Sequence, residues 1–286
     1  MPTVGQNLSK WGETYGWTDG GDEWSTIWGG PEAQWYFVIY PRIHRFLPAN
    51  KVLEIAPGHG RWTQFLRDHS QRFTGVDLSP GCVEACKQRF ADWPEAAFHV
   101  NDGYSLSMVP DSSIDFAFSF DSLVHAEWDV VAGYLQELSR VLAPDGVAFL
   151  HHSHMGVHVE GIAARLTARA ANHHWRALSV SGPKVEEECR RLGLACISQE
   201  RTNWGADFLS DCMSIVVRAD SSLARDCVVV DNPDFMRDAA YVADVSRPYV
   251  GGVIDPAKPA EPQPSVPKPT VGRGSFRGLV RLLVRR

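Results

Sequence analysis

The acids and glycines in the first third of the chain are spaced as a nucleotide-type ligand requires. The apolar run over 51–56 predicts a buried strand, and Gly58 and Gly60 predict a sharp turn into a helix over 61–69. Such a turn brings backbone N–H groups and a helix N-terminus close to a ligand. A second strand ends at Asp77, where nucleotide-type folds place a carboxylate for two ribose hydroxyls. The full G-x-G-x-x-G pattern is absent, which disfavours a dinucleotide site and a nicotinamide dehydrogenase.

The same residues resemble a known family. Glu54-x-Ala56-x-Gly58-x-Gly60, followed by Gly-Val-Asp77-Leu, is similar to motif I and the ribose acid of class I S-adenosylmethionine-dependent methyltransferases. The family usually has glycine where this chain has Ala56, and the extra methyl slightly narrows the approach to the cofactor. The resemblance implies S-adenosylmethionine as cofactor. It assigns these residues to cofactor binding: Glu54, Ala56, Gly58, Gly60, Asp77, Leu78, Asp102, Gly103 and Phe120.

Asp102 has two interpretations. It directly follows the third expected strand, where the resemblance implies a carboxylate that faces the adenine. The alternative is an Asx turn, in which the side chain accepts hydrogen bonds from the backbone two residues on.

The elements that position these residues alternate between strand and helix, which predicts a parallel sheet with right-handed crossovers. We expect strands at 52–56, 72–77, 97–100, 114–120, 147–150, 194–200 and 212–218, the last one antiparallel. We expect helices at 61–69, 80–90, 127–142, 159–171 and 181–192. The predicted fold is α/β, a Rossmann-like, seven-stranded, mostly parallel sheet with helices on both faces. The resemblance identifies this as the class I methyltransferase fold, with an N-terminal lid and a C-terminal extension.

The chain outside the sheet divides by composition. Residues 1–47 form a Trp/Gly-rich arm and a lid helix over 31–47, in which Pro41 predicts a kink. The cofactor-binding core is expected at 48–220 and a C-terminal extension with a short helix at 221–254. Residues 255–272 are a proline-rich linker, and residues 273–286 are a basic amphipathic tail. The tail could contact an anionic membrane surface or a glycosyltransferase.

Candidate catalytic residues follow two of the expected strands, because ligands of open α/β sheets gather at the carboxyl ends of strands. Asp121 and His125 follow one strand, and His151 and His152 follow another, on opposite sides of the chain. A hydroxyl acceptor needs a base near neutrality, for which histidine is suited. We expect His152 or His151 to be this base, with His125 as the rival and Asp121 orienting the acceptor or the base. Asp121 and histidines could also hold Mg²⁺, which would lower the pKa of the hydroxyl, although a paired-aspartate motif is absent.

The acceptor class is suggested by the first 30 residues, where tryptophans alternate with glycines and acids. These tryptophans could pack as an arm or offer flat faces to a carbohydrate. The phrases Asp22-Glu-Trp-Ser-x-x-Trp28, Ile55-Ala-Pro-Gly-His-Gly-Arg-Trp62 and Ser119-Phe-Asp-Ser-Leu-Val-His125, together with His151-His-Ser153, resemble bacterial glycan O-methyltransferases, such as those acting on mycobacterial methylmannose polysaccharides. This resemblance implies a mannoside or rhamnoside acceptor. The candidate substrate-binding residues are Trp28, Trp35, His154, His174 and Trp204. A small-molecule O- or N-methyltransferase of secondary metabolism, or a non-catalytic binding module, stays open.

Composition limits the remaining classes. The chain has 286 residues and a net charge of −6, which argues against a nucleic-acid binder. No apolar run approaches the roughly 20 residues of a membrane span, and no signal-peptide pattern is present. The six cysteines are scattered, which favours reduced thiols. We therefore expect a cytoplasmic protein, with peripheral contact at the inner face of the membrane through the tail as a further hypothesis.

Overall fold

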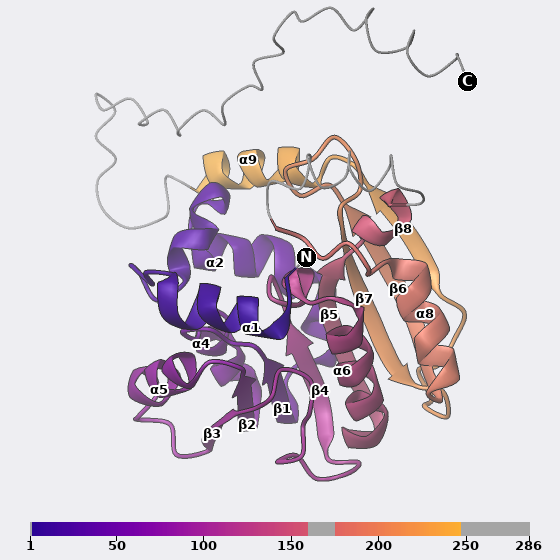
Figure 1. The fold of residues 1–286 in the computed structure, drawn as a ribbon, viewed down its shortest axis with the longest axis horizontal. Helices are drawn as coiled ribbons and strands as arrows, with labels where there is room; N and C mark the ends of the chain where they lie inside the picture. Colours follow the sequence, from indigo (N-terminus) through magenta and orange to yellow (C-terminus); the bar gives the residue numbers. More distant parts are fainter. Residues whose placement is uncertain (1, 160–174, 247–286) are drawn as a thin grey trace, which may run out of the picture. The chain divides into compact units, whose positions relative to one another are not determined.

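The computed structural model describes residues 2–159 and 175–246, which lie in the first of two compact units, residues 1–250. Its centre is a mixed eight-stranded sheet of order β3-β2-β1-β4-β5-β7-β6-β8 (Figure 1). The first five strands run parallel, and β7 is antiparallel to both of its neighbours. The strands are β1 (Ala49–Ile55), β2 (Ser70–Asp77), β3 (Ala96–Val100), β4 (Ile114–Ser119), β5 (Leu142–Ser153), β6 (Leu194–Thr202), β7 (Asp211–Arg218) and β8 (Val228–Asn232). The predicted α/β sheet with an antiparallel β7 is confirmed.

The sheet has eight strands where we expected seven, and the additional strand is β8. β8 contains three consecutive valines, a residue type that favours strands, and it pairs in parallel with β6 from Ser198 to Thr202. β5 is also longer than expected at both ends, because it begins before the Pro144-Asp-Gly146 turn and continues beyond residue 150 to Ser153. His151 and His152 therefore lie inside a strand rather than after it.

The helices predicted over 80–90, 127–142 and 181–192 are present as α5, α6 and α8, and α8 and α6 pack side by side (Figure 1). The helix predicted over 61–69 is shortened to α4, which a 3-10 turn follows. The lid helix over 31–47 is broken into α2, a π-helical turn and α3, which contains Pro41. The α-helices are α1 (Val4–Asn7), α2 (Pro31–Gln34), α3 (Tyr40–Ile43), α4 (Thr63–Leu66), α5 (Pro80–Arg89), α6 (Trp128–Val141), α8 (Gly182–Arg191) and α9 (Phe235–Ser246). The 3-10 and π segments are η1 (Leu8–Thr14), η2 (Asp22–Trp28), η3 (Trp35–Ile39), η4 (His44–Phe46), η5 (Arg67–His69), η6 (Leu123–His125) and η7 (Met155–His158). The expected helix over 159–171, the linker and the tail lie outside the described residues.

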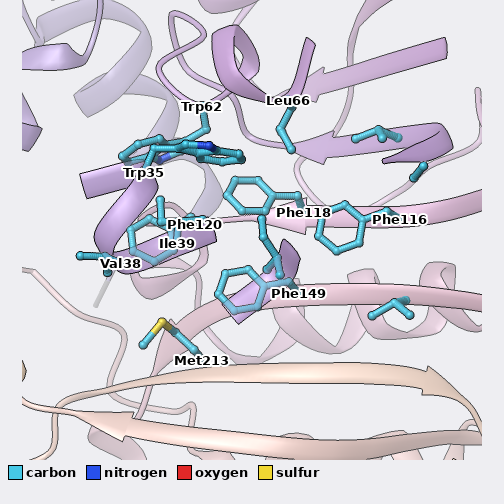
Figure 2. Packing of buried hydrophobic residues seen from close by; sticks show 14 of the residues in the cluster. Trp35, Val38, Ile39, Trp62, Leu66, Phe116, Phe118, Phe120, Phe149 and Met213 are labelled. Atoms are coloured by element: carbon cyan, nitrogen blue, oxygen red, sulfur yellow. The ribbon is translucent and has the colours of Figure 1, made fainter. Parts of the chain in front are cut away.

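Alternation along the strands divides the core between the two faces of the sheet. Phe118 of β4 and Phe149 of β5 lie on the face covered by α2, α3, α4 and α5, where Trp35 packs above them (Figure 2). Ala148 and Leu150 lie on the face covered by α6 and α8. The same alternation fixes the side of the sheet to which each histidine of β5 points.

In the part of the chain that the structure describes, no helix has the length and apolar character to cross a membrane.

Candidate active site

A cavity of about 820 Å³ lies where β1, β2 and β4 end, and the N-terminal residues form part of its wall. Most residues that the sequence assigned to the cofactor line it: Ala56, Gly58, Asp77, Leu78, Gly103 and Phe120. Glu54, Gly60 and Asp102 do not. The cavity therefore lies at the edge of the sheet where open α/β folds bind their ligands.

Asp77 closes β2 and presents its carboxylate to the cavity. This carboxylate accepts hydrogen bonds from the backbone N–H groups of Gly58, at 3.0 Å, and Ser79, at 2.8 Å. Burial raises the pKa of Asp77 to about 6, and the backbone N–H groups of Ser79, Gly58 and Leu78 limit the rise by stabilising the charged form. A carboxylate has about four acceptor positions, so capacity remains for a hydroxyl donor.

The turn after β1 is held in place by residues that do not touch the cavity. Glu54 is 1% exposed and accepts a hydrogen bond from Thr63 Oγ1 at 2.5 Å. A Cβ on Gly60 would lie 2.5 Å from the ring of Phe90, so this glycine allows α5 to approach the turn. Glu54 and Gly60 thus stabilise the turn through contacts outside the cavity. Ala56 has a φ of 58°, a left-handed conformation that strains a residue with a Cβ.

Part of the cavity wall comes from residues of the N-terminal arm between positions 4 and 27. Trp17 stacks on His59, with ring centroids 4.4 Å apart, and its indole lies over Gly58. Asn7 Nδ2 donates to the carbonyl oxygen of His125 at 2.9 Å. Trp11 lies against the His125 ring, with centroids 5.1 Å apart. The N-terminal arm therefore contacts both the glycine turn and the segment after β4.

Asp121 lies on the cavity wall between two arginines that the sequence analysis missed. Its carboxylate is 2.9 Å from Arg61 Nη2 and 3.8 Å from Arg176 Nη2. Burial works to raise the pKa of Asp121, but the two guanidinium groups outweigh it and hold the pKa below its ordinary value. Both arginines line the cavity. They carry no signal in the sequence, because neither belongs to a periodic pattern and their acidic partners are far along the chain.

His125 is the predicted histidine that reaches the cavity. Its Nδ1 is 3.0 Å from the carbonyl oxygen of Trp175, which can only accept, so Nδ1 carries the proton. Its Nε2 therefore has a free lone pair, and it forms no hydrogen bond within the described residues. Burial, and then the charge of Arg176, lower the pKa of His125 to about 4, so the ring is neutral near pH 7.

His151 and His152 lie on opposite sides of β5, as predicted, but neither lines the cavity. His151 lies directly behind it and accepts a hydrogen bond from the backbone N–H of Asp121 at 3.1 Å. His152, our first choice for the base, points to the face covered by α6 and α8, where its Nε2 is 2.8 Å from Ser214 Oγ. The alternation of the strand turns it away from the cavity, so the structure does not bring His152 to the site.

The other predicted substrate residues divide in the same way. Trp204 lines the cavity and packs over Arg176, 5.5 Å from ring centroid to guanidinium carbon. Trp28 and Trp35 are fully buried in the hydrophobic core, where Figure 2 shows Trp35 among the aromatic side chains above the sheet. His154 is also buried away from the cavity and accepts from the Gly182 N–H at 3.0 Å. His174 lies outside the described residues.

Trp28 and Trp35 do not line the cavity, but five tryptophans that we did not predict do: Trp11, Trp17, Trp24, Trp62 and Trp175. Their positions in the chain resemble those of the core tryptophans, so spacing alone could not separate the two groups.

Asp102 forms an Asx turn, which is the alternative to an adenine contact that the sequence analysis left open. Its side chain is exposed and accepts hydrogen bonds from the backbone N–H groups of Tyr104, at 3.1 Å, and Ser105, at 2.7 Å. This is an Asx turn, and it shapes the loop that brings Gly103 to the cavity.

The described residues give no support for the expected Mg²⁺ site. No three histidine, cysteine, aspartate or glutamate side chains among them converge on one point. The carboxylate of Asp121, the expected ligand, is instead held by Arg61.

Comparisons with known proteins agree with this architecture. Residues 52–146 match a family model described as a methyltransferase domain. Malonyl-[acyl-carrier protein] O-methyltransferase of Serratia marcescens is 33% identical over 101 residues, which cover 35% of this chain and 37% of that protein. The chain therefore spans little more than a third of the length of this curated relative.

Two solved structures share the fold. The PH0226 protein from Pyrococcus horikoshii has a TM-score of 0.51 and 20% identity, and covers 71% of this chain and 94% of its own. The N-methyltransferase NodS from Bradyrhizobium japonicum, in complex with S-adenosyl-L-homocysteine, has a TM-score of 0.51 and 16% identity, and the match covers 75% of this chain and 98% of the NodS chain. This chain has the class I methyltransferase fold and carries a methyltransferase domain.

The side chains that line the cavity fit S-adenosylmethionine. Asp77 at the end of β2 retains acceptor capacity for a ribose hydroxyl. Leu78, which follows Asp77, and Val130 and Tyr134 of α6 provide apolar and aromatic lining for the adenine ring.

Proposed function

We propose that this chain, which carries a methyltransferase domain over residues 52–146, is an S-adenosylmethionine-dependent O-methyltransferase with a carbohydrate hydroxyl as acceptor. The observation that carries the proposal is that Asp77 and His125 line one cavity. Asp77 supplies the carboxylate that ribose binding needs, and His125 supplies a ring nitrogen that can accept a proton.

The cofactor would supply a methyl group on a sulfonium that leaves as a neutral thioether. The chain's own part is to align the acceptor and to take its proton. The Trp175 carbonyl fixes the His125 ring through Nδ1, which leaves Nε2 to accept the hydroxyl proton. With a pKa of about 4, His125 is a weak base, so we expect proton transfer to accompany bond formation rather than to precede it.

The walls of the cavity favour a carbohydrate. Trp11, Trp24 and Trp175 offer flat aromatic faces, on which the C–H faces of a sugar can stack. Glu23 also lines the cavity, and its carboxylate already accepts from Tyr15 OH at 2.9 Å and from the Gly21 N–H at 2.8 Å. Its remaining lone pairs could accept from sugar hydroxyls. A mannoside or a rhamnoside is our preferred acceptor.

A carboxylate is the second candidate acceptor. Arg61 Nη1 is buried without a hydrogen-bond partner among the described residues, and a guanidinium pairs well with a carboxylate. The similar Serratia protein is named for O-methylation of a malonyl group on an acyl-carrier protein. A carboxylate acceptor is already ionised, so it would need no base.

The test is release of S-adenosylhomocysteine with mannosides, rhamnosides and a malonyl thioester in parallel. Under our proposal, a sugar turns over and His125→Gln lowers kcat at least 100-fold while cofactor binding is kept. Turnover of the malonyl thioester alone, with His125→Gln active and Arg61→Gln inactive, would establish the carboxylate reading instead. Cofactor binding without turnover on any acceptor would contradict both.

A further inference from the structure

Asp211, the first residue of β7, does not line the cavity. Its side chain is hydrogen-bonded to Arg176 and His151, and both of these residues interact with Asp121. Its side chain is fully buried. One carboxylate oxygen accepts from Arg176 Nε at 3.1 Å, and the other accepts from Arg176 Nη2 at 2.8 Å. The second oxygen is also 3.1 Å from His151 Nε2. Asp211 is therefore the common partner of an arginine in the cavity wall and a histidine behind it.

The hydrogen bonds determine the tautomer of His151. The backbone N–H of Asp121 can only donate, so His151 Nδ1 must accept from it at 3.1 Å. The proton of the neutral ring then lies on Nε2 and is donated to Asp211 Oδ2. A doubly protonated ring would place an N–H against the N–H of Asp121. His151 is thus a neutral link from the Asp211 carboxylate to the Asp121 backbone.

Asp121 needs such support, because its φ of 62° lies in the left-handed region that a residue with a Cβ rarely adopts. Two connections from Asp211 converge on it. His151 holds the strained backbone, and Arg176 lies 3.8 Å from the carboxylate. The ring of His151 is itself confined by Phe120 and Trp204, with centroids 4.6 and 5.3 Å away.

We propose that Asp211 is a positioning residue that sets the geometry of Asp121 and Arg176 at the wall of the cavity, through His151 on one path and directly on the other. The effect on turnover rests on the proposed methyltransferase function. Asp211 itself touches neither the cofactor nor the acceptor. Its role is to keep Asp121 and Arg176 where the acceptor meets them.

The first test does not depend on activity. In the full chain labelled with ¹⁵N, the imidazole signals of His151, assigned with His151→Asn, should show a neutral ring with the proton on Nε2. In Asp211→Asn, the backbone amide signal of Asp121 should shift, because the partner that orients His151 loses its charge. Ser214→Ala is the matched control, since it removes a buried hydrogen bond from the same strand on the opposite face. A proton on His151 Nδ1, or an Asp121 amide signal that is the same in wild type and Asp211→Asn, would overturn the proposal.

The second test is kinetic, on whichever acceptor turns over. Asp211→Asn should lower kcat about 10- to 100-fold, as expected for misplaced groups, with the Kd for S-adenosylhomocysteine within twofold of wild type. Ser214→Ala should leave kcat within twofold. An equal effect of the two substitutions on kcat would contradict a positioning role. If no acceptor turns over, the proposed function fails, and the NMR measurement still decides whether Asp211 holds Asp121. If Asp211→Asn does not fold, the tautomer in the wild-type protein still tests the network.

Discussion

The indole of Trp17 lies directly over Gly58, so that a Cβ on this glycine would come within 2.7 Å of the ring. The N-terminal arm and the turn after β1 are thereby fitted to each other at a position where only hydrogen is tolerated. Gly58 also has a φ of 59°, so two separate requirements select glycine here.

Replacing Gly58 should therefore affect both stability and the cofactor site. We expect Gly58→Ala to lower the free energy of unfolding by about 1–3 kcal/mol and to weaken S-adenosylhomocysteine binding at least 10-fold. The matched control is Gly5→Ala in α1, because a Cβ there meets nothing within 4 Å. Urea unfolding and a fluorescence titration measure the two effects. Equal stability and affinity in the two variants would show that the Trp17 contact does not constrain the turn.

Ala56 offers the opposite experiment on the same turn. Its φ of 58° costs a residue with a Cβ about 1–2 kcal/mol, whereas glycine adopts this conformation freely. Because glycine also gains entropy in the unfolded chain, we expect Ala56→Gly to change stability by only about 0 to +1 kcal/mol. Ala33→Gly in α2, at a buried helical position without a positive φ, should instead destabilise by about 1 kcal/mol or more. A loss of stability in Ala56→Gly as large as that in Ala33→Gly would contradict the strain.

Glu54 predicts a pH dependence of stability. Burial raises the pKa of this carboxyl to about 8, well above the ordinary value of 4.5. The unfolded chain therefore loses the Glu54 proton first, and the contribution of the buried neutral acid, which is full below pH 4.5, is lost as pH rises toward 8. Glu54→Gln keeps an oxygen that can accept from Thr63 and has no proton to lose. The stability of this variant relative to wild type should rise between pH 5 and 8.

The control for Glu54 is Glu187→Gln on the surface of α8, which removes the same charge from an exposed position. Its stability relative to wild type should stay constant over this range. Chemical unfolding at four pH values measures the two differences. A constant difference for Glu54→Gln would show that Glu54 is ionised in the folded protein.

The part of the site that could be predicted from the sequence is local in the chain. The turn at Gly58 and the acid at Asp77 each follow an apolar run, and a strand that ends at a given residue must present it at the edge of the sheet. Alternation also separated His151 from His152. It could not say which of the two faces the cavity, because that choice depends on which helices cover each face.

The part that could not be predicted depends on contacts between distant segments. Arg176 and Asp211 are 35 positions apart. They meet because Asp211 pairs with Ser153 at the end of β5, and Ser153 Oγ donates to the carbonyl oxygen of Ala177, the neighbour of Arg176. Trp28 and Trp11 both belong to the Trp/Gly-rich arm, yet Trp28 packs against Phe235 of α9 and Trp11 lines the cavity. Aromatic residues at similar spacing carry no mark that separates core from binding surface.

His125 and His152 have pKa values lowered by burial to about the same level, yet we expect their substitutions to have opposite consequences. Both ring nitrogens of His152 are hydrogen-bonded, to Ser214 Oγ and to the Ser153 carbonyl. His152→Asn should therefore destabilise the protein by about 1–3 kcal/mol and leave kcat within twofold. His125→Asn should lower kcat strongly at a smaller cost in stability, because among the described residues the His125 ring has one hydrogen bond to lose, from Nδ1 to the Trp175 carbonyl, and the His152 ring has two. A loss of kcat in a folded His152→Asn protein would show that His152, and not His125, acts as the general base.

Cys196 and Cys227 form a close thiol pair that predicts a response to oxidation. Their sulfurs are 3.9 Å apart, and Cys227 directly precedes β8, which pairs with β6. Reaction with oxidised glutathione by thiol–disulfide exchange would join the two sulfurs and release two molecules of reduced glutathione. Closing this 31-residue loop should stabilise the fold by roughly 3–4 kcal/mol on the chain-entropy model. In the wild-type protein we expect the number of free thiols to fall from six to four, and the peptide map to show a disulfide between Cys196 and Cys227. In the control Cys82→Ser the number should fall from five to three. Cys227→Ser should keep all five of its thiols, and a disulfide between any other pair would refute this prediction.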